Sequence, residues 1–308
     1  MAHNLVLEAE HLTQVFTLLQ PQDLPNTELN AQIGSWINTR SFMLSLLKRC
    51  ICPTAVSDEL LVKLQAVGFK RTPWTVESLT HQIKANKDFQ RAIINFVYLW
   101  VIKFVLPLMD KDMQSFSSTD SDSEYRLDLN VSTREMDRCA ITGIYSVEAF
   151  GFNNRAPGKV VPMRILPECL RSDDKAQHLV QVFTGGRIHS IRSIIDKPEN
   201  AIFMSEAITD SFREFYWSLK PAATTAPRTT RSNLAVERLA ALQVPEIASL
   251  PPNSPVVLGD NEASLSVPPP SPDLCRLHLA VGQILNETGS LPMILRFSMP
   301  GTLKEAKQ

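Results

Sequence analysis

The 308-residue sequence lacks an excess of charge of either sign. It holds 31 lysines and arginines against 32 aspartates and glutamates, which gives a formal net charge of −1. Proteins that are drawn to nucleic acid or to an anionic membrane by their overall field carry a large net positive charge. This composition therefore excludes binding by global charge and leaves only a local basic patch as a basis for it.

Cysteine is also scarce. The five cysteines are an odd number without regular spacing, unlike the framework of a small disulfide-stabilised secreted protein. The first ten residues, MAHNLVLEAE, contain acidic side chains and no basic stretch followed by a long apolar one, so they do not resemble a secretory signal. We therefore expect an intracellular protein, cytoplasmic or nuclear, with buried and reduced thiols.

Several catalytic and cofactor-binding motifs are missing as well. The sequence has no internal repeat and no Gly-x-Ser-x-Gly nucleophile turn, and the run Thr184–Arg187 is too short for a glycine-rich phosphate loop. Cys50 and Cys52 are separated by one residue, whereas zinc knuckles use about two to four and need a second pair. The sequence therefore predicts no cofactor and no metal site.

One apolar stretch, Ala92–Met109, is about as long as the shortest membrane-spanning helices. It contains Asn95, Lys103 and Pro107, and a charged side chain at mid-membrane costs a few kcal/mol even on the most lenient scale. This composition favours a helix buried in an α-helical domain. We therefore predict no association with a membrane.

The rest of residues 1–113 carries apolar residues at helical spacing. Residues 36–47 form one such run, followed by basic residues that suit a helix C-terminus. Ser57 reads as an N-cap with Gly68 as the stop, and Thr75 begins another helix. These signals predict an all-α N-terminal region.

Two segments are polar and read as linkers. In residues 114–125, a calcium loop starting at Asp120 would place Tyr125 and Val131 where the EF-hand needs glycine and glutamate, so a solvated linker is favoured. Residues 222–272 are rich in Pro, Thr and Ser and read as a tether with one short helix at 233–243. Its Pro268–Pro270 run fits a stiff spacer or a polyproline surface. Residues 273–308 are expected to form a C-terminal helix and tail.

Residues 126–221 differ from the helical region in their pattern of apolar residues. Residues 126–131 (RLDLNV) alternate like a strand, and short β-branched runs broken by Gly and Asn follow. Residues 176–186 read as a helix with a glycine stop, and residues 200–221 as a strand and a closing helix. The chain as a whole is therefore predicted to be an α+β protein.

Within this region the framework residues resemble those of the fungal HNH-endonuclease-like (ββα-metal) domain family. The resemblance rests on Cys139–Gly143 (CAITG), Ile165–Pro167, the Phe183–Gly186 turn, Asn200, and Phe212 with the closing Leu219–Pro221. It covers about residues 139–221, and residues 274–295 resemble the terminal helix of such proteins. The resemblance implies a helical N-terminal unit followed by a small ββα-metal domain and a C-terminal helix.

The resemblance also implies which positions would carry catalysis. An HNH site uses a strand histidine as general base and a helix histidine to hold one divalent metal ion. The positions that match these histidines hold Arg164 and Thr209, and the acid position after Phe212 holds Arg213, while Asn200 is retained. A guanidinium can neither accept a proton from water nor ligate a cation. We therefore expect a pseudoenzyme without nuclease activity.

None of the six histidines stands at a motif position. His178 and His189 lie inside the HNH-like region, but neither has a second ligand at metal-binding spacing. His189 is nonetheless a candidate binding residue together with Arg187 and Arg192, since arginines hold phosphate bidentately. Their region has a basic stretch that nearby acids offset, so solvated surface charge is the alternative. The basic residues are Arg155, Lys159, Arg164, Arg187, His189, Arg192 and Lys197, and the acids are Asp173, Asp174, Asp196 and Glu199.

Three functional hypotheses follow. The first is a degenerate HNH-like module with a binding or accessory role, whose ligand would be nucleic acid or a small molecule; the sequence identifies no protein partner. The second is the same fold reused as a metal-independent cyclase or isomerase in a fungal secondary-metabolite pathway, because fold does not fix function. The third is an active nuclease with rearranged ligands, which needs His178 or His189 beside a carboxylate near Asn200. An apolar pocket would favour the second hypothesis if it were lined by Phe183, Phe203, Phe212, Tyr216 or Trp217.

Overall fold

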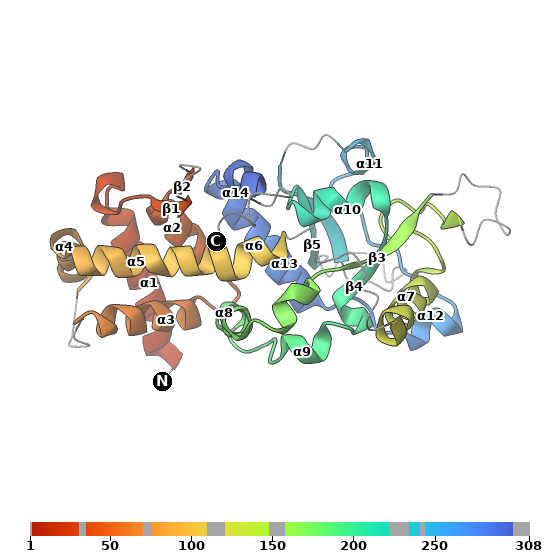
Figure 1. The fold of residues 1–308 in the computed structure, drawn as a ribbon, viewed down its shortest axis with the longest axis horizontal. Helices are drawn as coiled ribbons and strands as arrows, with labels where there is room; N and C mark the ends of the chain where they lie inside the picture. Colours follow the sequence, from red (N-terminus) through yellow and green to blue (C-terminus); the bar gives the residue numbers. More distant parts are fainter. Residues whose placement is uncertain are drawn as a thin grey trace. The chain divides into compact units, whose positions relative to one another are not determined.

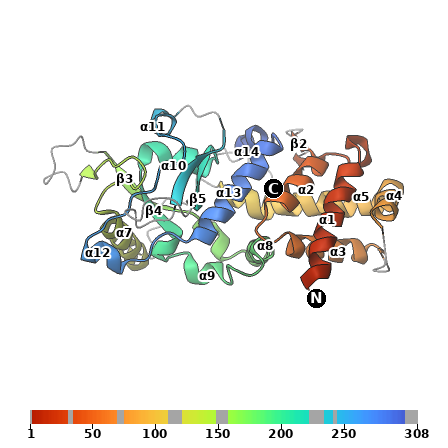
Figure 2. The same ribbon diagram turned by 180° about the vertical axis from the view of Figure 1, so that it is seen from behind.

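The computed structural model describes residues 2–30, 35–69, 75–109, 121–147, 158–221, 234–240 and 244–297. It is a mixed α+β protein whose chain divides into two compact units (Figures 1 and 2). The helical unit comprises residues 1–107, 173–189 and 283–308. The sheet unit comprises residues 108–172 and 190–282. The boundaries differ from the predicted ones, because residues 173–189 lie within the predicted HNH-like domain but belong to the helical unit.

The helical unit is built around α1, which packs against α2, α3 and α4, while α3 also packs against α5 and α8. Its only strands among the described residues are β1 and β2, which pair antiparallel with Thr27 opposite Ile37. The elements are α1 (Ala2–Leu18), η1 (Pro21–Asp23), β1 (Thr27–Asn30), β2 (Ser35–Ile37), α2 (Thr39–Arg49), α3 (Pro53–Ala66), α4 (Val76–Ala85), α5 (Lys87–Trp100), the π-helical turn η2 (Val101–Val105), α8 (Asp174–Thr184) and α14 (Leu291–Phe297).

Most of the helix boundaries follow local signals. The Thr75 hydroxyl accepts a hydrogen bond from the Ser78 amide and caps α4, as predicted. Gly68 follows α3 with φ +101, and Gly185 ends α8 with φ +61, so both glycine stops are confirmed. Ser57 is not an N-cap, because α3 already begins at Pro53, a residue that suits the first helical turn.

The apolar stretch runs from α5 through η2 into α6 (Leu106–Leu108). Pro107 has no amide hydrogen, and just before it the Leu106 amide bonds to the Val101 carbonyl, one residue further back than in an α-helix. Lys103 forms an ion pair with Asp173 at 3.1 Å. The helix Lys87–Leu108 has a mean hydropathy of 1.6 over a window of which 56% is buried. It could cross a membrane by length and composition, but core helices of soluble proteins meet the same weak criterion.

The sheet unit contains two antiparallel strand pairs, β3 with β4 and β5 with β6. α7 packs against β3, β4 and α12, and α10 packs against β3, β4 and β5. The elements are α7 (Ser121–Glu135), β3 (Val160–Arg164), η5 (Glu168–Arg171), α9 (Ile191–Ile194), η6 (Pro198–Asn200), β4 (Ala201–Ser205), α10 (Glu206–Arg213), β5 (Trp217–Pro221), β6 (Leu234–Arg238), α11 (Pro245–Ala248), α12 (Glu262–Ser266) and most of α13 (Pro272–Glu287).

The strand predicted at residues 126–131 is wrong, because this segment is part of α7. Leu127 and Val131 are buried one helical turn apart, whereas Leu129 is 52% exposed. The alternation of Leu127, Leu129 and Val131 fits a strand, while Leu127 and Val131, four residues apart, also fit one face of a helix. Because only Leu127 and Val131 are buried, the burial pattern is that of a helix. The predicted linker at 114–125 ends earlier than expected, since α7 begins at Ser121, and residues 110–120 lie outside the described part of the chain.

The tether predicted at residues 222–272 is also wrong for the part that the structure describes. The helix predicted at 233–243 is instead β6, which pairs with β5 from Trp217 opposite Arg238 to Pro221 opposite Leu234. Further apolar residues of this segment, such as Ile247 and Val256, are buried. A strand that depends on a distant partner has no local signal of its own. The predicted C-terminal helix is divided into α13 and α14 by a turn at Gly289, which has φ +65.

Arg134, in the last turn of α7, has no solvent-exposed side-chain surface. Its five N–H groups all donate hydrogen bonds: Nε and Nη2 to Glu135 Oε1 at 3.0 and 2.7 Å, and Nη2 also to the Ala201 carbonyl at 2.6 Å. Nη1 donates to the carbonyls of Pro198 and Pro268 at 2.8 and 2.7 Å. One side chain therefore joins α7 to the start of β4 and to the segment before α13.

Candidate functional site

Of the residues that match the HNH framework, Ile165–Pro167 and Asn200 lie where β3 ends and β4 begins, whereas the Phe183–Gly186 turn belongs to the helical unit. The two strands pair from Val160 opposite Ser205 to Arg164 opposite Ala201. α10 follows β4 directly and packs against both strands through a face that includes Ile208 and Phe212. The local order is therefore strand, strand and helix, with residues 165–200 inserted between the strands.

Asn200 occupies the last position before β4 and is fully buried. Its Oδ1 accepts from the Leu166 amide at 2.8 Å, and its Nδ2 donates to the carbonyls of Leu166 and Ile195 at 2.9 and 3.0 Å. The Ile165 amide donates to the Asn200 carbonyl. Asn200 therefore fixes the backbone that follows Arg164.

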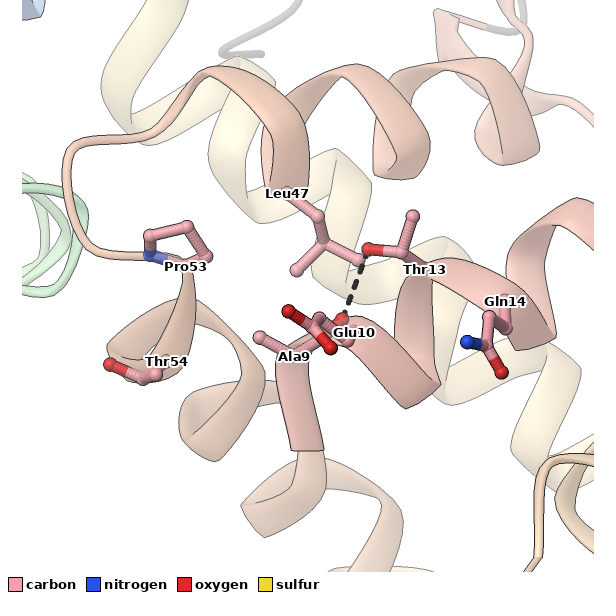
Figure 3. Close-up of a pocket in the computed structure, with 7 residues that line it drawn as sticks. All are labelled: Ala9, Glu10, Thr13, Gln14, Leu47, Pro53 and Thr54. Carbon is pink, nitrogen blue, oxygen red and sulfur yellow. Dashed lines mark hydrogen bonds between the residues drawn. The ribbon is translucent and has the colours of Figure 1, made fainter. Parts of the chain in front are cut away.

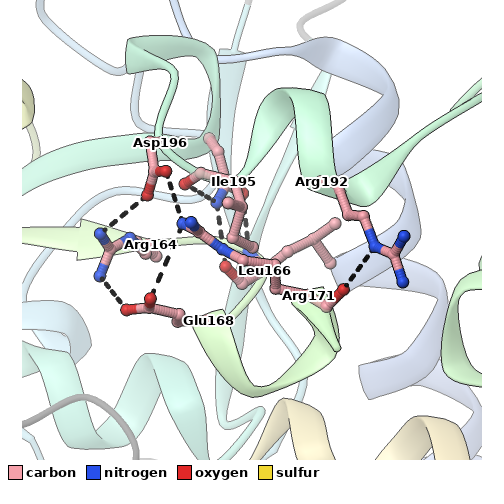
Figure 4. Close-up of polar contacts among 8 residues, drawn as sticks. Arg164, Leu166, Glu168, Arg171, Arg192, Ile195 and Asp196 are labelled. Atoms are coloured by element: carbon pink, nitrogen blue, oxygen red, sulfur yellow. Dashed lines mark hydrogen bonds and ion pairs between the residues drawn. The ribbon is translucent and has the colours of Figure 1, made fainter. Parts of the chain in front are cut away.

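Arg164, the position of the general base in the resemblance, is 8% exposed and is held by two carboxylates. Its Nη2 lies 3.3 Å from Asp196 Oδ1, and its Nη1 lies 3.6 Å from Glu168 Oε2. Arg171 contacts the same two acids, with Nη2 2.5 Å from Asp196 Oδ2 and 3.7 Å from Glu168 Oε1 (Figure 4). We call these four residues the ion-pair network.

The ion-pair network alternates positive and negative side chains and is electrically neutral as a set. Its members come from the end of β3, from η5 and from the turn after α9. Arg192, on α9, donates from Nε to the Arg171 carbonyl at 3.1 Å and so helps to hold η5 (Figure 4). Because the carboxylates neutralise both guanidinium groups, the network is a polar centre in which neither arginine is an open, unpaired cation.

Thr209 and Arg213, the other motif positions, make contacts within their own helix. The Thr209 hydroxyl donates to the Glu206 carbonyl at 2.9 Å, and Arg213 Nη1 lies 3.6 Å from Asp210 Oδ1. Burial lowers the pKa of the Arg213 guanidinium, although Asp210 opposes this shift. Arg213 Nε is buried without a hydrogen-bond partner among the described residues. Among the described residues, neither side chain forms a hydrogen bond or an ion pair with Arg164.

The three predicted binding residues are divided between the two units. Arg187 and His189 belong to the helical unit, where the His189 carbonyl accepts a hydrogen bond from Gln181 at 2.7 Å. Arg192 belongs to the sheet unit. Arg192 contacts the ion-pair network through the Arg171 carbonyl.

His178 and His278 have clear partners. His178 lies on α8, and its Nε2 is 3.2 Å from Glu59 Oε2 in the helical unit. His278 is buried in the sheet unit, where it stacks on Phe212 and Phe215 at centroid distances of 4.0 and 4.4 Å. Its Nδ1 lies 2.7 Å from the Ser218 hydroxyl, and burial lowers its pKa to about 3. His278 is therefore a neutral core residue.

The cysteines are free thiols. Burial raises the pKa of Cys50 and of Cys275 to about 12, so neither is a thiolate at neutral pH. In the part of the chain that the structure describes, no three His, Cys, Asp or Glu side chains converge as a metal site would require.

A separate groove lies in the helical unit among α1, the end of α2 and the start of α3 (Figure 3). Its volume is about 470 Å³, and apolar residues and hydroxyl or amide groups line it together with one carboxylate. These residues are Ala9, Glu10, Thr13, Gln14, Leu47, Pro53 and Thr54. We assign no reaction to this groove.

Sequence reasoning missed three members of the ion-pair network: Glu168, Arg171 and Asp196. The spacing of Arg164, Glu168 and Arg171 was a local signal, since charges of opposite sign three and four residues apart pair readily across a turn. Asp196 had no such signal, because it is 32 residues from Arg164. Comparisons of the chain with protein-family models, with curated proteins and with solved structures found no match.

Proposed function

We propose that the region from Cys139 to Pro221, apart from the residues of the helical unit, is a degenerate ββα-metal module of the HNH-endonuclease-like type. In this proposal the protein is a pseudoenzyme that binds a ligand and does not hydrolyse a phosphodiester. A fungal source and a role in secondary metabolism remain part of the hypothesis and rest on the family resemblance alone.

The observation that carries the proposal is the setting of Arg164. It stands at the end of β3, next to the retained Asn200, and its guanidinium is engaged by Asp196 and Glu168. A general base must accept a proton from water, and a guanidinium that stays protonated and is paired with carboxylates has no acceptor atom for it. The order β3, β4 and α10 supports the same interpretation, because a ββα module has two paired strands and a following helix.

The contacts of Phe183, Phe212 and Trp217 do not favour the enzyme alternative. Phe212 contacts Trp217 at a centroid distance of 4.9 Å and stacks on His278. Phe183 packs in the helical unit against Trp100 and Phe104. These aromatic residues fill the cores of their units and contact one another there, so they support close packing and give no support to a ligand pocket.

The alternative of rearranged nuclease ligands needs a histidine beside Asn200. His178 contacts the Glu59 carboxylate, and neither residue is a hydrogen-bond partner of the Asn200 side chain. The side-chain partners of Asn200 are backbone groups of the sheet unit. The degenerate module is therefore the function that we propose.

A nuclease assay tests the proposal. Purified full-length protein incubated with supercoiled plasmid DNA and Mg²⁺ or Mn²⁺ is expected to leave the plasmid intact, and metal analysis is expected to find no stoichiometric ion. Metal-dependent nicking that disappears in Asn200→Ala, with the variant shown to be folded by circular dichroism, would overturn the proposal. Arg276→Gln, which changes a charge on an exposed face of α13, serves as the control variant.

A further inference from the structure

The two arginines of the ion-pair network have more donors than acceptors. Each guanidinium carries five N–H groups. Within the described residues, the network's only hydrogen bonds from these groups are those to Asp196. The contacts with Glu168, at 3.6 and 3.7 Å, are ion pairs beyond normal hydrogen-bond distance. The network is thus electrically neutral, but several of its N–H donors have no acceptor among the described residues. We call such a centre unsaturated.

The unsaturation lies inside the protein. Nε of Arg164 and Nε of Arg171 are both buried and have no hydrogen-bond partner in the described part of the chain. The Arg164 side chain is more than nine-tenths buried. A buried donor that makes no hydrogen bond costs stability, so such groups at a polar centre point to a ligand that completes them.

Glu168 is the member of the network that another anion could displace. It is the first residue of the four-residue helix η5, and its side chain is 33% exposed. Both of its contacts with the arginines are longer than those of Asp196. Turning the Glu168 carboxylate into solvent would leave two arginines and one aspartate, which is a site with a net charge of +1.

We propose that Arg164 and Arg171 bind a phosphate group in the place that the Glu168 carboxylate occupies. A phosphate offers several acceptor oxygens, and arginine forks bind such oxygens bidentately. The inference rests on the proposed binding role of this module, and it names the class of ligand. The phosphate belongs either to a free phosphate compound or to the backbone of a nucleic acid, since both present the same oxygens.

Glu168 acts in this proposal as an internal competitor. Its removal should therefore strengthen binding, whereas loss of any merely structural ion pair should not. An increase in affinity when Glu168 is removed therefore distinguishes a ligand site from a network that only stabilises the fold.

Isothermal titration calorimetry of the full chain at low salt tests the proposal, with EDTA present so that no metal-dependent cleavage intervenes. One arm uses inorganic phosphate, and the other uses a short single-stranded oligonucleotide without terminal phosphates. We expect Arg171→Gln to weaken binding about tenfold or more, because a charge-assisted bidentate contact is lost. We expect Glu168→Gln to tighten binding several-fold, with the affinity of Arg276→Gln unchanged.

The two arms identify the source of the phosphate. Binding of inorganic phosphate alone, sensitive to Arg171→Gln, supports a free phosphate ligand, and binding of the oligonucleotide with the same sensitivity supports a nucleic-acid backbone. The absence of binding in both arms would overturn the inference, as would equal affinities of the wild type, Arg171→Gln and Glu168→Gln. Either result leaves the proposed loss of nuclease activity intact, because only the plasmid assay tests that loss.

Discussion

Two arginine centres of the sheet unit differ in how they use their donors. Arg134 satisfies all five N–H groups with protein acceptors, and its neighbour Glu135 is buried with it. Arg164 and Arg171 share two partly exposed carboxylates and keep buried Nε groups without partners among the described residues. An arginine whose N–H groups all have protein acceptors stabilises the fold and has no donor left for a ligand. An unsaturated pair retains the capacity to bind.

The largest expected effect is at the saturated centre. Arg134→Met would leave the Glu135 carboxylate and three backbone carbonyls without their donors. Breaking a buried ion pair by removing one partner costs about 3–5 kcal/mol, so we expect a loss of that size in the free energy of unfolding or a failure to fold. Urea unfolding followed by circular dichroism measures it. Arg276→Met, at an exposed position, should change the free energy by less than about 0.5 kcal/mol.

The pH dependence of stability sharpens the comparison at the same centre. Burial raises the pKa of Glu135 to about 7, against the lowering effect of Arg134. The folded protein then holds a proton that the unfolded chain releases above about 4.5, so this group makes stability fall as pH rises from about 4.5 to 7. His278 acts in the opposite sense, because its folded pKa of about 3 makes stability rise between about 3 and 6.5.

The two slopes oppose each other between about pH 5 and 6.5, so the wild-type protein should show little net dependence there. His278→Gln removes the rising contribution. Its free energy of unfolding is expected to fall by about 1 kcal/mol per pH unit across this range. Urea titrations at several pH values test this, and a flat profile in the variant would show that Glu135 is ionised throughout.

A smaller effect is expected at the unsaturated centre. Arg164→Met removes one member of the ion-pair network, but Arg171 and water remain to solvate Asp196 and Glu168, whose side chains are 28% and 33% exposed. We expect a loss of about 1 kcal/mol in the free energy of unfolding. A loss as large as that of Arg134→Met would erase the distinction between the two centres.

The smallest effect on stability is expected for Glu168→Gln. Its ion pairs are long and partly exposed, so the change in the free energy of unfolding should stay below about 0.5 kcal/mol. The same variant is predicted to bind phosphate more tightly than the wild type. A variant that is destabilised by several kcal/mol would identify Glu168 as a structural residue rather than a displaceable one.

The elements that the sequence predicted correctly are those with local signals. Thr75 and Gly185 act through hydrogen bonds and backbone angles within a few residues, so their roles can be inferred from the chain alone. β6 was missed because it is defined by its pairing with β5, from which residues 222–233 separate it. Part of α7 was predicted to be a strand because Leu127, Leu129 and Val131 alternate with polar residues. Leu129 is exposed in the structure, so the alternation does not reflect burial.

The candidate site was predictable to the same extent. Arg164 and Asn200 were placed in one site through the family resemblance, and the structure brings them together. Asp196 could not be inferred, because it reaches Arg164 from a turn 32 residues away. Arg187 and His189 belong to the helical unit and Arg192 to the sheet unit, and their grouping in one binding site stays a prediction.

The insertion between β3 and β4 has a consequence for how the protein can be dissected. The chain leaves the sheet unit after Ser172, contributes residues 173–189 to the helical unit, and returns at Ser190 before β4 forms. No single cleavage point separates the units, and a fragment such as residues 126–221 would carry α8 without the helices that bury Phe183. Pairing of β3 with β4 closes a loop of more than thirty residues. During synthesis these two strands can therefore pair only after the whole loop has emerged from the ribosome.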